Sequence, residues 1–208
     1  MSERTGPPLT GSGVSRRAFL KGSGAAAAAS AIPAAIAEAQ DDQREASSGV
    51  VSGRTTIQLD VNGQTHDVAV MPTTTLLDVL RYQLDLTGAK PVSMDGSSGA
   101  STVLIDGKPM TASTTLALAA RGKKIETVES LGHDDVDAVQ RAFVEHDAQQ
   151  CGFCTPGFVV AVRAFLNQNP NATDAQIREG LNGNICRCGT YYDVIEAATA
   201  LVKGGGNG

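Results

Sequence analysis

Two stretches of the chain decide its fold: Gln150-Cys151-Gly152-Phe153-Cys154-Thr155-Pro156-Gly157 and Ile185-Cys186-Arg187-Cys188-Gly189. Together they hold all four cysteines of the 208 residues, in the order C-x2-C, thirty-one residues, C-x-C. Four thiolates in two close pairs can surround one metal centre. The neighbouring glycines carry no Cβ, so the backbone can approach such a centre closely.

On spacing alone, three interpretations of these thiols stay open. A [2Fe–2S] cluster takes four thiolates. A structural zinc site with four cysteines usually repeats C-x2-C, which the single-residue gap between Cys186 and Cys188 fits less well. Two disulfides are the third interpretation, although a disulfide inside C-x-C would close a short, strained ring.

The wording around the cysteines, QCGFCTPG followed by a predicted helix and then NICRCGTY, favours iron. It resembles the iron–sulfur small subunit of the molybdenum hydroxylases, the xanthine oxidase and aldehyde oxidoreductase family. The resemblance covers roughly residues 55 to 203. It implies that Cys151, Cys154, Cys186 and Cys188 hold one [2Fe–2S] cluster, and that Gln150 and Cys188 contact a pterin.

The N-terminus predicts export. Ser15-Arg16-Arg17-Ala18-Phe19-Leu20-Lys21 carries a twin arginine that matches the Tat signal pattern, and an alanine-rich stretch follows it. Ala37-Glu38-Ala39 is a small-residue cleavage site, so we expect cleavage before Gln40 and a periplasmic mature protein. Tat carries folded proteins, which suits a cluster inserted in the cytoplasm and weakens the disulfide interpretation.

Charge and hydropathy exclude other classes of partner. The net charge of −5 and the lack of a basic stripe argue against nucleic acid. No run of eighteen apolar residues occurs, so no membrane span is predicted.

The middle of the chain alternates short strand and helix patterns. Asn62-Gly63 predicts a two-residue hairpin turn, and Asp106-Gly107 a second turn. A hairpin, a helix and further short strands in this order resemble a β-grasp, the plant-type ferredoxin fold. The expected strands cover 56–61, 66–70, 102–105 and 124–128, and the expected helices 73–86 and 115–120.

After Gly132 the pattern becomes helical. One predicted helix leads into Gln150, and Thr155 is expected to cap the next, with Pro156 at its first position. Thr173 with Gln176 predicts a capping box for a third helix, and a fourth covers about 191–203. The fold class is therefore α+β, a β-grasp domain followed by a four-helix [2Fe–2S]-binding bundle. The expected divisions are a signal over 1–39, a flexible linker over 40–54, the β-grasp domain over 55–131, the helical domain over 132–203 and a disordered tail over 204–208.

The family's ferredoxin-like domain carries a second [2Fe–2S] cluster, and residues 99–107 here read GASTVLIDG where the family has GACTVLIDG. The resemblance implies that every cysteine position of that cluster is serine. A hydroxyl holds its proton far more tightly than a thiol, so we expect no second cluster and a mobile loop over 91–100. The positions of this vacated site are Ser93, Ser98, Ser101 and Ser113.

The resemblance implies an electron-transfer subunit with no complete active site of its own. Its partners would be a large subunit with a molybdenum–pterin cofactor, which hydroxylates aldehydes or N-heterocycles, and an FAD subunit or another acceptor. Tat export makes the chain most similar to the periplasmic aldehyde oxidoreductases. Two alternatives are an export escort for the large subunit and a zinc-stabilised binding module.

Overall fold

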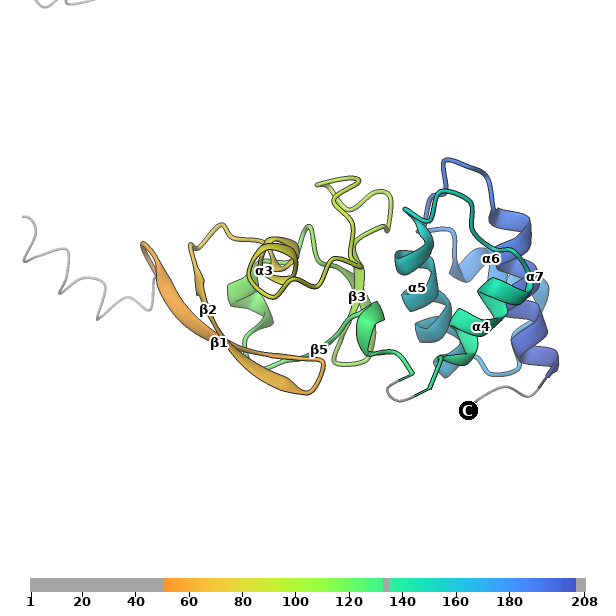
Figure 1. Ribbon diagram of the computed structural model, residues 1–208, viewed down its shortest axis with the longest axis horizontal. Helices are drawn as coiled ribbons and strands as arrows, with labels where there is room; N and C mark the ends of the chain where they lie inside the picture. Colours follow the sequence, from red (N-terminus) through yellow and green to blue (C-terminus); the bar gives the residue numbers. More distant parts are fainter. Residues whose placement is uncertain (1–50, 133–134, 205–208) are drawn as a thin grey trace, which may run out of the picture. The chain divides into compact units, whose positions relative to one another are not determined.

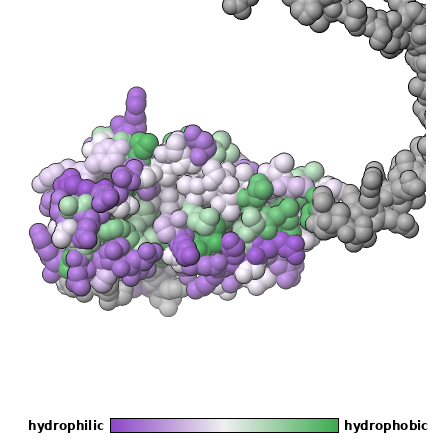
Figure 2. All heavy atoms as spheres, turned by 180° about the vertical axis from the view of Figure 1, so that it is seen from behind, coloured by the Kyte–Doolittle hydropathy of each residue, from purple (hydrophilic) through white to green (hydrophobic). Residues whose placement is uncertain are grey.

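This structure, a computed structural model, describes residues 51–132 and 135–204 (Figure 1). The predicted signal over 1–39, most of the predicted linker and the tail beyond Gly204 lie outside the described residues. Within the described ranges no helix is long and apolar enough to cross a membrane. On the face drawn in Figure 2, hydrophilic residues predominate and apolar residues form smaller patches between them.

The first half of the described chain forms one five-stranded sheet with the order β2-β1-β5-β3-β4. β1 runs parallel to β5, and every other pair is antiparallel. The hairpin between β1 and β2 turns at Asn62 and Gly63, whose φ values of 55° and 74° confirm the predicted two-residue turn. The strands are β1 (Thr55–Val61), β2 (Gln64–Val70), β3 (Thr102–Ile105), β4 (Lys108–Thr111) and β5 (Lys124–Glu126).

α3 (Leu76–Tyr82) is shorter than the predicted helix over 73–86. It begins at residue 76 because the Thr75 side chain accepts a hydrogen bond from Asp78 N, which makes Thr75 the cap. Just beyond the helix, Gln83 donates to Ala69 O at 3.1 Å and accepts from Ala69 N at 3.2 Å. The Gln83 amide thus occupies part of the free edge of β2, where another strand would otherwise pair. Two 3-10 turns complete this half, η1 (Ala117–Ala120) and η2 (Val128–Ser130).

Four helices follow: α4 (Ala138–Glu145), α5 (Thr155–Gln168), α6 (Asp174–Gly180) and α7 (Tyr191–Lys203). Thr173 and Gln176 form the predicted capping box of α6. A second box, Asp137 with Gln140, starts α4 and was not predicted. α4 ends at residue 145, five residues before Gln150, so the prediction that this helix leads into Gln150 was wrong.

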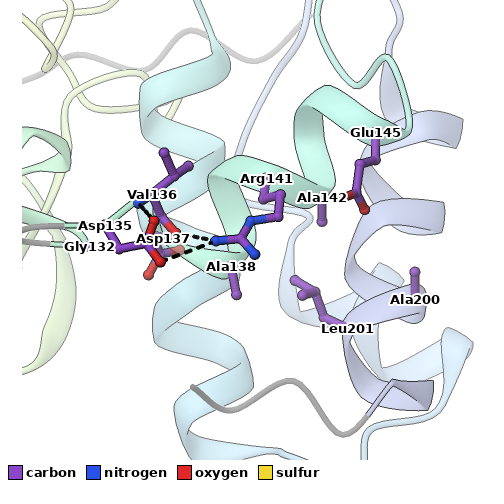
Figure 3. Close-up of a pocket in the computed structure, with 10 residues that line it drawn as sticks. All are labelled: Gly132, Asp135, Val136, Asp137, Ala138, Arg141, Ala142, Glu145, Ala200 and Leu201. Carbon is purple, nitrogen blue, oxygen red and sulfur yellow. Dashed lines mark hydrogen bonds and ion pairs between the residues drawn. The ribbon is translucent and has the colours of Figure 1, made fainter.

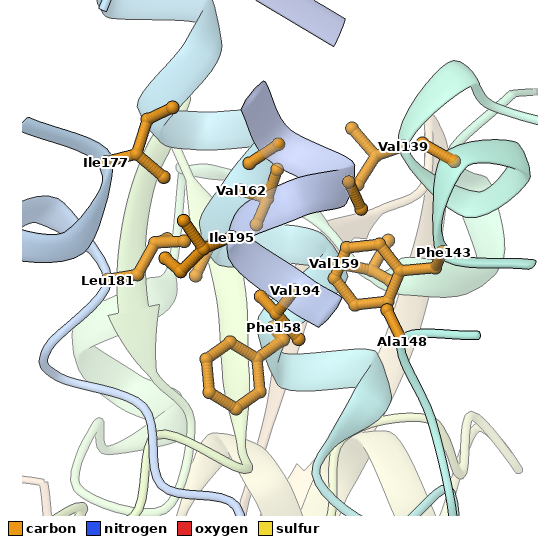
Figure 4. Packing of buried hydrophobic residues seen from close by; sticks show 14 of the residues in the cluster. Val139, Phe143, Ala148, Phe158, Val159, Val162, Ile177, Leu181, Val194 and Ile195 are labelled. Carbon is orange, nitrogen blue, oxygen red and sulfur yellow. The ribbon is translucent and has the colours of Figure 1, made fainter. Parts of the chain in front are cut away.

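The helices enclose their own apolar core, shown in Figure 4, and the sheet with α3 encloses another. Phe158 and Val162 of α5 lie at the centre of the helical core, against Val194 of α7. A smaller cluster joins the two halves, because Leu104 of β3 packs against Val160 of α5.

A buried ion pair also fastens the start of the helical half. Asp137, which caps α4, pairs with Arg163 of α5, and only 9% and 10% of their side chains are exposed. Removing one partner of such a pair leaves the other charge buried and unpaired, at a cost of about 3–5 kcal/mol.

Candidate functional site

The four cysteines lie in two loops of the helical half. Cys151 and Cys154 belong to the loop between α4 and α5, and Cys186 and Cys188 belong to the loop between α6 and α7. All four are free. The structure thus brings together the ligands predicted from residues more than thirty positions apart.

The thiols meet as two pairs. Cys186 is among the groups that raise the pKa of Cys154, and Cys151 is among those that shift the pKa of Cys188, so the thiols approach one another as these two pairs. Among residues 51–132 and 135–204, no three His, Cys, Asp or Glu side chains are grouped closely enough to hold a single metal ion. A binuclear iron cluster needs two thiolates on each iron, so two pairs of soft sulfur donors fit it better than they fit one zinc ion.

The two pairs differ in their surroundings. Cys186 is 5% exposed and Cys154 is half-buried, whereas Cys151 and Cys188 are exposed. Burial, the hydrogen bond with Cys186 and the nearby negative charge of Cys186 and Cys151 raise the pKa of Cys154 to about 12. Burial also acts to raise the pKa of Cys186, but hydrogen bonds from Thr190, Cys154 and Gly189 outweigh it and lower that pKa to about 7. The protein therefore favours a thiolate at Cys186, the form that binds metal.

The start of α7 supplies most of these donors. The Thr190 hydroxyl donates to Cys186 Sγ at 3.2 Å. The backbone N–H groups of Thr190 and Gly189 also help to lower the pKa of this thiol. The Tyr191 hydroxyl accepts from Cys186 N at 2.8 Å and holds the backbone of the same residue. The Tyr191 ring meets Phe158 of α5 edge to face at 6.2 Å, so the cysteine loop is anchored to the core.

The N-terminus of α5 departs from the prediction. Cys154, not Thr155, occupies the cap position, and no side chain makes a capping bond there. The Thr155 hydroxyl is buried without a partner. Pro156 is therefore the second residue of α5, and not the first as was predicted.

The four predicted positions of the vacated site also lie together, in the sheet half. Their hydroxyls form two hydrogen-bonded pairs, Ser93 with Ser98 at 2.6 Å and Ser101 with Ser113 at 3.0 Å. Ser98, Ser101 and Ser113 are 2–8% exposed. These buried hydroxyls have partners, so the site is satisfied without an ion.

The loop over 91–100 is tied down, and the prediction that nothing holds it was wrong. Its Ser98 O accepts from Ile185 N at 2.9 Å, which bonds it to the residue before Cys186. Asn184 Nδ2 donates to Gly99 O at 3.1 Å. A Cβ at Gly157 of α5 would lie 2.5 Å from Gly99 O, so only glycine allows this close approach. The serine loop therefore rests directly on both cysteine-bearing segments.

Gln150 lies in the loop before Cys151 and is exposed. Cys188 is exposed as well. Both residues predicted to contact a pterin are therefore solvent-exposed in the isolated chain, where a partner could reach them.

A surface pocket of about 480 Å³ lies elsewhere, between the start of α4 and the end of α7 (Figure 3). Arg141 spans it, paired with Asp135 at 3.5 Å. It contains none of the predicted site residues.

Sequence reasoning missed Thr190, Tyr191 and Asn184 as parts of the site. A signal for Thr190 was present, because a threonine directly before an apolar helical period marks an N-cap next to the cysteines. Asn184 carried no such signal, because its partner Gly99 is eighty-five positions away.

Comparisons with known proteins identify relatives of this chain. Residues 127–199 match the family model described as a [2Fe-2S] binding domain, and residues 13–33 match the TAT (twin-arginine translocation) pathway signal sequence. The chain is 42% identical to the nicotine 6-hydroxylase small subunit of Paenarthrobacter nicotinovorans, over 70% of this chain and 88% of that protein. It is 40% identical to the aldehyde oxidoreductase iron-sulfur-binding subunit PaoA of Escherichia coli K12, over 68% of this chain and 69% of that protein.

Among solved structures, one chain of quinoline 2-oxidoreductase from Pseudomonas putida 86 superposes with a TM-score of 0.70 at 39% identity. The match covers 74% of this chain and 97% of that one. The mixed α and β structure of this chain is thus similar to that of a solved oxidoreductase chain.

Proposed function

Because this chain belongs to the family of iron–sulfur small subunits of the molybdenum hydroxylases, we propose that it is the electron-transfer subunit of such a complex, acting on aldehydes or N-heterocycles. The Tat signal exports it to the periplasm. The observation that carries the proposal is the gathering of four free cysteines into two thiol pairs.

Under this proposal the four cysteines hold one [2Fe–2S] cluster, which when bound supplies one-electron transfer. Cys154 and Cys186 hold it from the buried side, and Cys151 and Cys188 hold it at the surface. The donors at the start of α7 stabilise the Cys186 thiolate. The backbone of the C-x-C loop is held by Tyr191, which keeps the ligands in place before metal arrives.

The domain divisions are part of the same proposal. We assign residues 55–131 to a β-grasp domain of the plant-type ferredoxin kind and residues 132–203 to a four-helix [2Fe–2S]-binding bundle. The separate apolar cores of the sheet half and the helical half support this division.

The proposed partners are a large molybdenum–pterin subunit and an FAD subunit or another acceptor. The exposed Gln150 and Cys188 are the proposed contacts with the pterin. The second cluster is proposed to be absent, because the hydroxyls of the vacated site bond to one another and are poor iron ligands.

Iron, zinc and acid-labile sulfide analysis of the purified chain tests the proposal. We expect about two iron and about two sulfide ions per chain, and a single rhombic paramagnetic signal after reduction. A single zinc ion would overturn the cluster assignment. Twice the expected iron would show that the serine site binds a cluster after all.

The alternative of an export escort that conducts no electrons finds no support among the relatives, whose names describe hydroxylase and oxidoreductase subunits. The zinc-stabilised binding module is likewise not favoured, since the matched family model is a [2Fe-2S] binding domain.

A further inference from the structure

Thr190 uses its side chain in an unusual way. It is the N-cap of α7, and a threonine there ordinarily accepts a hydrogen bond from the N–H groups of the first helical turn. Its side chain makes no such capping bond. The hydroxyl donates instead to Cys186 Sγ at 3.2 Å.

This hydrogen bond is buried away from solvent. Thr190 is 1% exposed and Cys186 is 5% exposed, so no solvent screens the contact. In a low-dielectric setting a donor acts more strongly on a charged sulfur than it would in water. The opposite thiol pair, Cys151 and Cys188, is exposed to solvent.

Hydrogen bonds to cluster sulfurs withdraw electron density from iron and shift its reduction potential. One-electron reduction by dithionite adds one negative charge to the bound cluster. A donor aimed at a ligand sulfur stabilises that added charge, so the potential rises. We propose that the Thr190 hydroxyl raises the reduction potential of the cluster held by Cys186, and so sets how readily this subunit accepts electrons. This inference rests on the proposed cluster ligands.

Thr190 is a positioning residue in this account, and the decisive readout is a potential. The experiment uses the full chain with its cluster, titrated with dithionite and redox mediators. Thr190→Val keeps the shape of the side chain and removes the hydroxyl, so its midpoint potential should be more negative than that of the unmodified chain. Thr190→Ser restores the hydroxyl and should restore the midpoint.

Thr199 offers a matched control on the same helix. Its hydroxyl is buried without a hydrogen-bond partner, so Thr199→Val should leave the potential unchanged. Thr190→Ala, which adds no bulk, should repeat the negative shift if the valine variant fails to fold.

The possible results distinguish failure of this inference from failure of the proposed electron-transfer function. A normal iron and sulfide content with an unchanged midpoint in Thr190→Val or Thr190→Ala overturns the inference alone. Loss of the cluster from both variants, with a normal chain for Thr190→Ser, would make the hydroxyl purely structural and also overturns it. A chain that holds zinc or no iron overturns the proposed function, and this inference with it.

Discussion

Gln150 is one of the two residues proposed to contact the pterin of the partner subunit. It is exposed directly before Cys151, and it lies in a loop because α4 ends at Glu145. An exposed glutamine costs nothing when it lacks a partner within the chain, so its role has to be sought in the complex.

Gln150→Ala should weaken binding of the large subunit or slow electron entry, because a lost hydrogen bond costs about 0.5–1.5 kcal/mol, up to about tenfold in affinity. The measurement is a titration of the large subunit with the variant, followed by turnover. Gln149 is exposed as well, so Gln149→Ala is the control. Equal binding and turnover for the two variants would remove Gln150 from the pterin contact.

At the scale of elements, the packing of the serine loop on α5 depends on the absence of one side chain. A Cβ on Gly157 would meet Gly99 O at 2.5 Å, and backbone atoms cannot swing aside as a flexible side chain can. The close contact therefore couples the loop over 91–100 to the helix that begins at the cysteines.

Gly157→Ala should destabilise the chain. Overpacking costs about 1–3 kcal/mol, which exceeds the roughly 1 kcal/mol that alanine gains over glycine inside a helix. We expect a net loss on the order of 1 kcal/mol in the free energy of unfolding, measured by denaturant titration. Gly183→Ala, where a Cβ meets nothing within 4 Å, is the control. A Gly157 variant at least as stable as the unmodified chain would contradict the close approach.

Local patterns predicted the elements well where the deciding residues are neighbours. The Asn62-Gly63 turn and the Thr173–Gln176 box were predicted because each is complete within four residues. The pairing of Asp137 with Arg163 spans twenty-six positions and is visible only after folding. The loop over 91–100 was predicted mobile for the same reason, since its bond to Ile185 joins distant parts of the chain.

In the candidate site, too, some features could be predicted from the sequence and others could not. The approach of the four thiols could be predicted from the motif around them, because cysteines in two close pairs suit a shared metal centre. The mutual pairing of the serine hydroxyls was not, because serine suits loops that bind nothing as well as buried hydrogen-bonded sites.

For the whole molecule, the proposed loss of the second cluster interrupts electron delivery. Rapid mixing of the assembled complex with substrate should give fast reduction of one cluster and little reduction of a distal flavin, followed by absorbance and paramagnetic signals. Changing Ser93, Ser98, Ser101 and Ser113 together to cysteine should return the second cluster and the fast phase. Normal flavin reduction in the unmodified complex would show that electrons leave by another route.

The self-paired hydroxyls have a consequence for how the cell matures this protein. Because Ser93 and Ser101 find their partners within the chain, the sheet half can complete its folding when iron is scarce. The Tat machinery carries folded chains. Export should therefore depend on iron only through the folding of the half that carries the cysteines. If the chain holds the single proposed cluster, only one metal-loading step precedes export, and the exported yield should follow cytoplasmic iron as a single binding event.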